Sequence, residues 1–160
     1  MVGGRYGAVA GLGGLIVALD QASKLWVLDA ISAAKPFIEV TSFLNIVLVW
    51  NRGISFGVLN RDSTWQPWAL IGVAMAIVIG LLIWLRKIEA RMLIVAIALI
   101  VGGALGNVID RIRLGAVVDF VDFHFSGWHF ATFNVADAAI TFGVVILLLD
   151  SLFGSGKSAK

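Results

Sequence analysis

Four apolar stretches, each close to the length that a helix needs to cross a lipid bilayer, constrain the fold of this chain most strongly. They cover about residues 6–28, 68–85, 92–109 and 135–153, and the second and third contain no charged residue. A helix needs about 20 mainly apolar residues to span a bilayer core. Because 60% of the residues are hydrophobic and 14% are charged, the composition excludes an ordinary water-soluble domain. The sequence predicts a mainly α-helical integral membrane protein with four transmembrane helices, folded as a single membrane-embedded domain over residues 1–160.

The first apolar stretch has the outline of a cleaved signal sequence, since Arg5 precedes it and small residues follow it at positions 32–34. Two features argue for its retention. Its apolar run is long for a signal sequence, and it carries Asp20, Gln21 and Lys24, which a disposable segment does not need. We expect this stretch to remain as the first transmembrane helix.

Basic residues predict the orientation of the chain. Arg86, Lys87 and Arg91 crowd into the loop between the second and third stretches, which marks that side as cytoplasmic. With four spans, both termini also lie in the cytoplasm, and the segments of about residues 29–67 and 110–134 lie outside it. The net charge of +2 arises from residues that flank apolar stretches, so we expect no nucleic-acid partner. Six basic residues fall toward the opposite side: Lys24, Lys35, Arg52, Arg61, Arg111 and Arg113.

The two extracytoplasmic segments are more than linkers. Three runs within them, at residues 37–41, 43–50 and 117–125, are rich in β-branched and aromatic residues. Such residues favour β-strands. We therefore expect a small extracytoplasmic β-sheet that rests on the membrane surface.

Polar residues gather at one end of the predicted helix bundle. Successive spans run in opposite directions, so the ends of the first and third spans and the start of the fourth lie on the same side. Ionisable side chains at membrane depth cost about 2.5 to 3.5 kcal/mol each, and they usually have a function. The sequence therefore predicts a polar site at the outer face, with these members: Asp20, Lys24, Asn107, Asp110, Arg111, Asn134 and Asp137.

Structural roles for the same residues compete with the functional ones. Asp137 follows Asn134 at the start of a helix, where an acidic residue is favourable. Asp20 and Lys24 are four residues apart, which suits an ion pair on one helix face. Asp110 lies next to Arg111 and permits the same interpretation.

A pair of neighbouring aspartates suits peptide hydrolysis, because repulsion keeps one carboxyl protonated while the other is ionised. The ionised group takes a proton from the attacking water, and the protonated group assists the carbonyl oxygen and the leaving amine. This chemistry requires no metal and no cofactor. Composition leaves the partner of Asp137 open, since Asp110, Asp119 and Asp122 are comparable candidates.

Four motifs together resemble the lipoprotein signal peptidases, also called signal peptidase II. Residues 106–120 match the family pattern GNxxDRxxxGxVxDF at every fixed position, and residues 133–137 match FNxAD. Residues 51–56 are similar to the family motif NxGxxF, and residues 20–24 to its motif DQxxK. The resemblance covers most of the chain, although Arg52 and Ser55 depart from the commoner small residues of their motif.

The resemblance implies roles for individual residues. Asp119 and Asp137 correspond to the catalytic pair of the family, which makes Asp122 a bystander. Other residues of the matching motifs are implied to organise the site or to bind the substrate: Asp20, Lys24, Asn51, Gly53, Asn107, Asp110, Arg111, Asn134 and Ala136.

The resemblance also implies a substrate and a location. The family substrate is a bacterial prolipoprotein with a diacylglyceryl group on its cysteine, cleaved on the amino side of that cysteine at the outer surface of the cytoplasmic membrane. The expected partners are this substrate, membrane lipids and inhibitors such as globomycin, with no obligate protein partner.

Four other interpretations receive less support. Gly53–Gly57 matches the nucleophile pattern G-x-S-x-G, with His124 or His129 as a base, but that pattern belongs to a strand-to-helix turn of a soluble α/β sheet. A zinc site lacks an HExxH motif and any cysteine. A small transporter requires polar groups across the bilayer, yet the acids gather at one face. A noncatalytic assembly partner does not need so large a polar cluster.

Overall fold

The structure is a computed structural model that describes residues 2–53 and 65–153. Its helices are α1 (Val2–Ala30), α2 (Gln66–Trp84), the short 3₁₀ helix η1 (Leu85–Lys87), α3 (Arg91–Leu114) and α4 (Val135–Phe153). Its strands are β1 (Phe37–Thr41), β2 (Leu44–Asn51), β3 (Val117–Phe125) and β4 (Trp128–His129). In the described residues, four helices are long and apolar enough to cross a membrane. The predicted mainly α-helical membrane fold is therefore confirmed.

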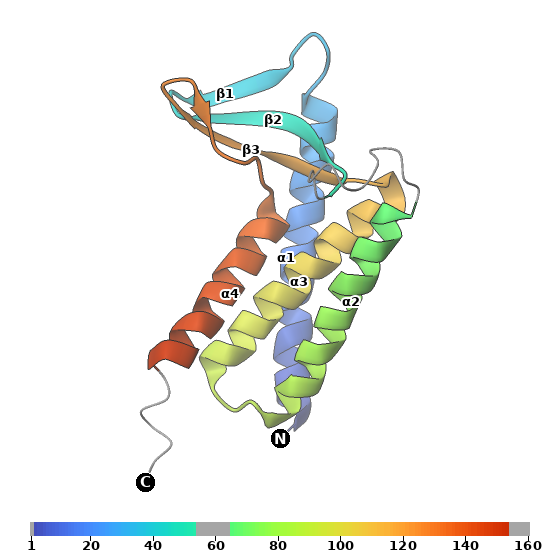
Figure 1. Cartoon of the computed structure of the whole chain (residues 1–160), viewed down its shortest axis with the longest axis vertical. Coiled ribbons are helices and arrows are strands. Elements are labelled where there is room, and N and C mark those ends of the chain that lie inside the picture. The colour runs from blue at the N-terminus through green and yellow to red at the C-terminus, as the bar shows by residue number, and fades with distance from the viewer. Residues whose placement is uncertain (1, 54–64, 154–160) are drawn as a thin grey trace.

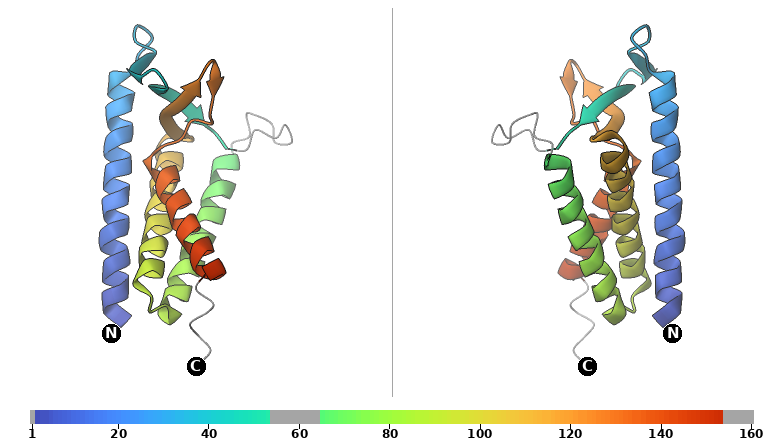
Figure 2. Two further views of the ribbon diagram at one scale, coloured as in Figure 1. Left: turned by 90° about the vertical axis from the view of Figure 1, so that its left-hand side faces the viewer. Right: turned by 90° about the vertical axis from the view of Figure 1, so that its right-hand side faces the viewer.

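Helix α3 is the centre of the bundle. Its most apolar stretch is 67% buried within the protein, against 22%, 11% and 17% for α1, α2 and α4. Helices α1, α2 and α4 all pack on α3, and Figures 1 and 2 show α2 and α4 on different sides of it. The outer helices therefore expose most of their surface, as lipid contact requires.

Helix α3 continues beyond its predicted end at residue 109. It includes Asp110 and Arg111 and ends at Leu114, followed by Gly115 with a φ of 72°. The charged side chain of Asp110 stays inside the bundle because Lys24 of α1 pairs with it at 2.8 Å. The left-handed conformation of Gly115, which glycine adopts at little cost, then redirects the chain into β3.

Close contact between α3 and α4 depends on Gly103. A Cβ atom at this position would meet the carbonyl oxygen of Ala136, and would lie 2.8 Å from Cγ1 of Ile140. We expect Gly103→Ala to lower the unfolding free energy by about 1 to 3 kcal/mol, because the helices must move apart. Thermal unfolding, followed by tryptophan fluorescence, measures the effect.

Gly72→Ala in α2 is the matched control, because nothing lies within 4 Å of a Cβ atom there. This substitution should leave the unfolding temperature unchanged or raise it slightly. If Gly103→Ala and Gly72→Ala unfolded at the same temperature, the close contact between α3 and α4 at Gly103 would not be important for stability.

The two segments between the spans form one antiparallel sheet with the strand order β1-β2-β3-β4. β2 pairs with β3 over a register that joins Leu44 to Phe123 and Asn51 to Val117. The sheet packs on the helix ends through Val27 of α1 and Ile46 of β2. Figure 1 shows it at the end of the bundle where α1 and α3 finish and α4 begins. The predicted small sheet is confirmed, and it covers the predicted polar site.

Candidate active site

Asp119 lies near the start of β3 and is only 2% exposed. The amide nitrogen of Asn51 donates to one carboxylate oxygen at 2.9 Å. The amide nitrogen of Asn134 donates to the other oxygen at 2.7 Å. Pairing of β2 with β3 brings Asn51 to this carboxylate, although 68 residues separate the two in sequence. The sheet, through Asn51, and the residue that precedes α4, Asn134, therefore fix the position of the Asp119 carboxylate.

Asp137 lies in the first turn of α4. Its backbone N–H donates to the side-chain oxygen of Asn134 at 2.9 Å, and the Asn134 N–H donates to the Asp137 carboxylate at 3.4 Å. This reciprocal pair is a capping box. Asn107 of α3 donates to the other Asp137 oxygen at 2.8 Å. Asp137 thus takes part in the helix cap that its position predicts, and it also faces α3.

Two asparagines join the two carboxylates. Asn134 bonds to both Asp119 and Asp137, and its side chain is fully buried. Asn107 accepts from Asn134 at 3.4 Å and donates to Asp137. A continuous network therefore connects a carboxylate on the sheet with a carboxylate on a transmembrane helix.

A buried ion cluster lies beneath this network. Lys24 pairs with Asp20 and with Asp110, both at 2.8 Å, and all three side chains are at least 97% buried. Lys24 also donates to the side-chain oxygen of Asn107 at 3.1 Å. The predicted pair of Asp20 and Lys24 is present. The alternative pairing of Asp110 with Arg111 is wrong, because Asp110 turns inward to Lys24.

Each acid of the ion cluster also holds the backbone beside a candidate catalytic residue. Asp20 accepts from the N–H of Ala136 at 3.0 Å, next to Asp137. Asp110 accepts from the N–H of Val118 at 3.1 Å, next to Asp119. The ion cluster therefore positions both carboxylates through the main chain. Ala136 contributes through its backbone and is itself fully buried.

Gly53 holds the side chain of Asn51. Its N–H donates to the Asn51 side-chain oxygen at 2.9 Å, which leaves the Asn51 amide nitrogen free to bind Asp119. Gly53 has a φ of 109°, a conformation that side chains rarely allow, and a Cβ atom would lie 2.6 Å from Cδ1 of Leu70. Both observations explain glycine at this position.

Arg111 projects from the last turns of α3 and donates to the carbonyl oxygen of Asn107 at 3.4 Å. It is partly buried, beside the carboxylates of the site. The negative charges of Asp137, Asp110 and Asp119 attract its guanidinium.

Gln21 joins the site, although the sequence alone did not single it out as a site residue. Its amide nitrogen donates to Asp110 at 2.8 Å and to Asp20 at 3.1 Å, and its oxygen accepts from Arg113 at 3.1 Å. The signal that could have identified Gln21 is its place inside the DQxxK motif, between Asp20 and Lys24. Gly106 also belongs to the site, because a Cβ atom there would lie 2.6 Å from the Asp20 carboxylate.

Asp122 lies apart from this network. Its carboxylate oxygens lie 2.9 and 3.0 Å from Nδ1 of His129, the residue with which it forms an ion pair when the imidazole is protonated. No group of three or more His, Cys, Asp or Glu residues in the described parts of the chain is arranged to hold a metal ion. Ser55, the alternative nucleophile, lies outside the described residues.

Burial raises the pKa of Asp119 to about 6 from its ordinary value of 3.8. Repulsion from Asp137 contributes to this rise in the pKa, whereas hydrogen bonds from Asn51 and Asn134 oppose it. The two carboxylates therefore interact electrostatically. Such a pair can hold one proton between two acids.

The raised pKa of Asp119 predicts how stability depends on pH. Between about pH 4 and pH 6 the folded protein holds a proton that the unfolded chain releases, so stability falls as pH rises. At pH 8, removal of the buried charge in Asp119→Asn should contribute up to about 3 kcal/mol of stability, because a tenfold change in proton affinity corresponds to about 1.4 kcal/mol. The loss of one of the two hydrogen bonds that the carboxylate accepts from Asn51 and Asn134 offsets part of this gain. The gain should disappear below about pH 4. Thermal unfolding of wild type and variant at both pH values measures it.

Glu39→Gln on β1 is the control, because Glu39 is exposed. It should change the unfolding temperature little at either pH. A stability difference between Asp119→Asn and wild type that is the same at pH 8 and below pH 4 would show that burial of the ionised carboxylate costs nothing.

Comparison with known proteins places this geometry in a family. Residues 12–153 match the family described as Signal peptidase (SPase) II. The chain belongs to the signal peptidase II family. It is 49% identical over 150 residues to the lipoprotein signal peptidase of Methylorubrum extorquens (strain PA1), which covers 92% of this chain and 86% of that protein. It is 46% identical over 144 residues to the lipoprotein signal peptidase of Burkholderia vietnamiensis (strain G4 / LMG 22486), which covers 89% and 86%.

Solved structures agree with the membership in the signal peptidase II family. A bacterial membrane enzyme superposes with a TM-score of 0.81 at 29% identity, and covers 96% of this chain and 93% of its own. A second solved structure, also of a bacterial membrane enzyme, gives a TM-score of 0.80 at 31% identity. The bundle and its sheet are therefore shared with an enzyme of bacterial membranes.

Proposed function

We propose that this signal peptidase II removes signal peptides from diacylglyceryl-modified bacterial prolipoproteins by hydrolysis on the amino side of the modified cysteine. The observation that carries the proposal is the network through which Asn134 bonds to the carboxylates of both Asp119 and Asp137. It supports the assignment of these two aspartates as the catalytic pair, because a peptidase of this type needs two carboxyls held together. The curated relatives carry the name lipoprotein signal peptidase.

In this mechanism, one carboxylate removes a proton from the water that attacks the scissile carbonyl. The other carboxyl is protonated, donates a hydrogen bond to the carbonyl oxygen, and then protonates the leaving amine. Asn134 and Asn107 hold the pair in position. The guanidinium of Arg111, which Asp137 and Asp119 attract, is the proposed group that stabilises the charge developing on the oxygen.

The arrangement of the helices supports lateral entry of the substrate. α2 and α4 both pack on α3 and make no extended contact with each other, so the site at the end of α3 can be approached between them. An apolar signal helix and its lipid anchor can remain in the bilayer during this approach. Cleavage then occurs at the level where α3 meets the sheet.

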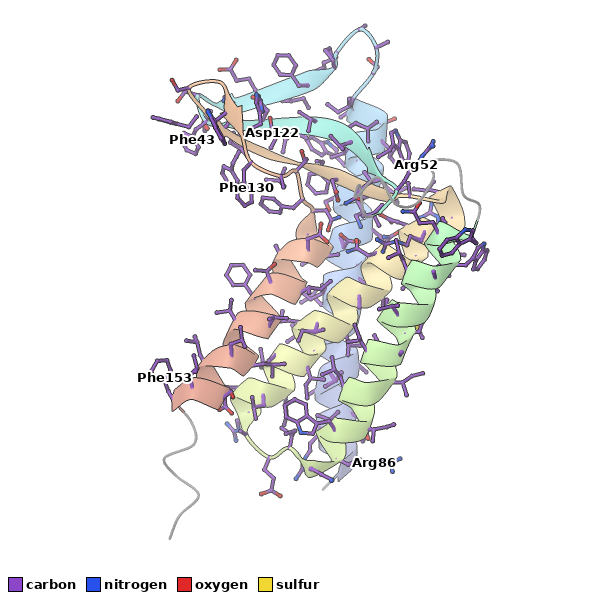
Figure 3. The ribbon with its side chains drawn as sticks, in the orientation of Figure 1. Phe43, Arg52, Arg86, Asp122, Phe130 and Phe153 are labelled. Atoms are coloured by element: carbon purple, nitrogen blue, oxygen red, sulfur yellow. The ribbon has the colours of Figure 1, made fainter. Side chains whose placement is uncertain are left out.

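The proposed orientation places both termini in the cytoplasm and the aspartates at the outer face of the bacterial cytoplasmic membrane. Arg86, Lys87 and Arg91 support it, because they lie at the end of the bundle opposite the sheet. In Figure 3, Arg86 lies at that far end, whereas Arg52 lies beside the sheet. We also propose that residues 1–160 form one membrane-embedded domain. This domain is proposed to contact membrane lipids and to bind inhibitors such as globomycin.

Cleavage of a purified prolipoprotein in detergent tests the proposed function. The substrate is offered in two forms, one with the diacylglyceryl group and one without it, and mass spectrometry identifies the new termini. We expect cleavage of the lipid-modified form alone, on the amino side of its cysteine. Cleavage at another bond, or equal cleavage of both forms, would contradict the proposal, as would ion flux into liposomes without peptide cleavage.

A further inference from the structure

The end of the sheet farthest from the catalytic pair carries aromatic side chains that are largely uncovered. Phe125, Trp128 and Phe130 are 80%, 84% and 71% exposed, and Phe123 is 41% exposed. Phe125 and Trp128 are partners in the ladder of β3 and β4. The N–H of Phe130 donates to the carbonyl oxygen of Phe123 at 2.8 Å, which continues this hairpin. These four residues are called the aromatic tip below.

The aromatic tip lies on the face of the sheet that turns toward the helices. Side chains alternate between faces along a strand, so Phe123 and Phe125 share the face of Val121. Asp119 lies on the same face and bonds to Asn134 beside the start of α4, and Phe123 stacks on Phe133 with ring centroids 6.0 Å apart. Residues paired across a ladder share a face, which places Trp128 there too. Figure 3 shows Phe130 on the helix side of the strands.

The opposite face of the same hairpin is polar. Glu39, Asn45 and Asp122 form one row across β1, β2 and β3. His124 pairs with His129 in the ladder, and His129 contacts Asp122 at 2.9 Å. The hairpin therefore has an aromatic side on the face of Asp119 and a titratable side on the opposite face. Such two-sidedness is typical of a segment at the boundary between lipid and water.

The hairpin also projects beyond the bundle. Figure 1 shows this end of the sheet reaching sideways past the start of α4, and Figure 2 shows it on the same side of the molecule as α4. α4 exposes large apolar side chains along its length, among them Phe142 at 65% and Leu148 at 56%. The surface of a transmembrane helix with such exposure faces lipid. The aromatic tip continues this lipid-facing surface outward along the sheet.

We propose that the aromatic tip inserts into the lipid–water interface on the sheet side of the bilayer and anchors the sheet there. Tryptophan and other aromatic side chains concentrate at this level of membrane proteins. Because Phe123 and Phe125 belong to β3, the strand that carries Asp119, the anchor also fixes the height of Asp119 relative to Asp137 on α4. The bilayer thereby helps to align the catalytic pair.

Fluorescence of single labelled cysteines tests the anchor. The chain contains no cysteine, so Trp128→Cys and Glu39→Cys each provide one labelling site, on the aromatic and on the polar face. Each variant carries an environment-sensitive fluorophore and is reconstituted, as the full chain, in phosphatidylcholine and phosphatidylglycerol liposomes. Nitroxide-labelled lipid and aqueous iodide serve as the two quenchers.

We expect the label at position 128 to emit at shorter wavelength, and to be quenched several-fold more strongly by the nitroxide lipid than by iodide. The label at position 39 should show the reverse. Iodide quenching at position 128 as strong as at position 39 would overturn the anchor. Protection of position 128 from both quenchers would also overturn it, because it would indicate a protein partner such as a second copy of the chain.

Discussion

Replacement of Asp137 with asparagine is expected to lower the rate of prolipoprotein cleavage by about 10²- to 10⁴-fold, the usual contribution of a general acid or base. Asparagine has the same shape and can still accept from Asn107, so the 2.8 Å contact that joins α3 to α4 can persist. The variant loses the negative charge, the ability to exchange a proton, and the second carboxylate oxygen, which accepts from the Asn134 N–H at 3.4 Å. The rate is measured with purified enzyme and lipid-modified substrate.

Asp150→Asn is the matched control for this result. Asp150 lies on the same helix, is exposed, and sits far from the capping turn that holds Asp137. The Asp150→Asn variant should cleave the substrate at the wild-type rate. Asp137→Asn with near-normal activity and an unchanged unfolding temperature would remove Asp137 from the catalytic pair.

Replacement of Lys24 with methionine is expected to produce the largest loss of stability, about 3 to 5 kcal/mol. Lys24 is the cation of the buried ion cluster, and its removal leaves Asp20 and Asp110 close together without compensation. Activity should fall as well, because these acids hold the backbone N–H groups of Ala136 and Val118. Thermal unfolding and cleavage rate measure the two effects.

Lys35→Met is the control for loss of a lysine, because Lys35 is exposed. Its unfolding temperature should stay close to that of wild type, since exposed charges contribute little to stability. If Lys24→Met unfolded at the same temperature as Lys35→Met, the ion cluster would not be a stabilising element of the bundle.

Much of the fold follows from local sequence patterns. The long apolar stretches predict the four spans because the bilayer sets their length, and β-branched runs predict strands in the connecting segments. The end of α3 was the harder boundary. Charged residues from Asp110 onward marked the end of the apolar stretch, but pairing with Lys24 of α1 keeps Asp110 inside the helix bundle. That compensation is a contact between distant segments, and a local pattern does not contain it.

The location of the candidate site at one end of the bundle was predictable from the direction of the spans. Antiparallel spans bring Asp20, Asn107 and Asp137 to one end, whichever way the chain is inserted. The choice of Asp119 over Asp122 came from the family motif alone. In the structure it depends on the register of β2 with β3, which brings Asn51 to Asp119, and on the side chain of Asn134. Asp122, three residues later, contacts His129 instead.

The most direct test of the proposed catalytic pair compares Asp119→Asn with Asp122→Asn in the same strand. The measurement is the rate of a single turnover of lipid-modified prolipoprotein with excess enzyme. Asp119→Asn should cleave about 10²- to 10⁴-fold more slowly than wild type while unfolding at no lower temperature, and Asp122→Asn should cleave within a few-fold of wild type. A slow Asp122→Asn variant beside an active Asp119→Asn variant would contradict the assignment of Asp119 and Asp137 as the pair that hydrolyses the peptide bond.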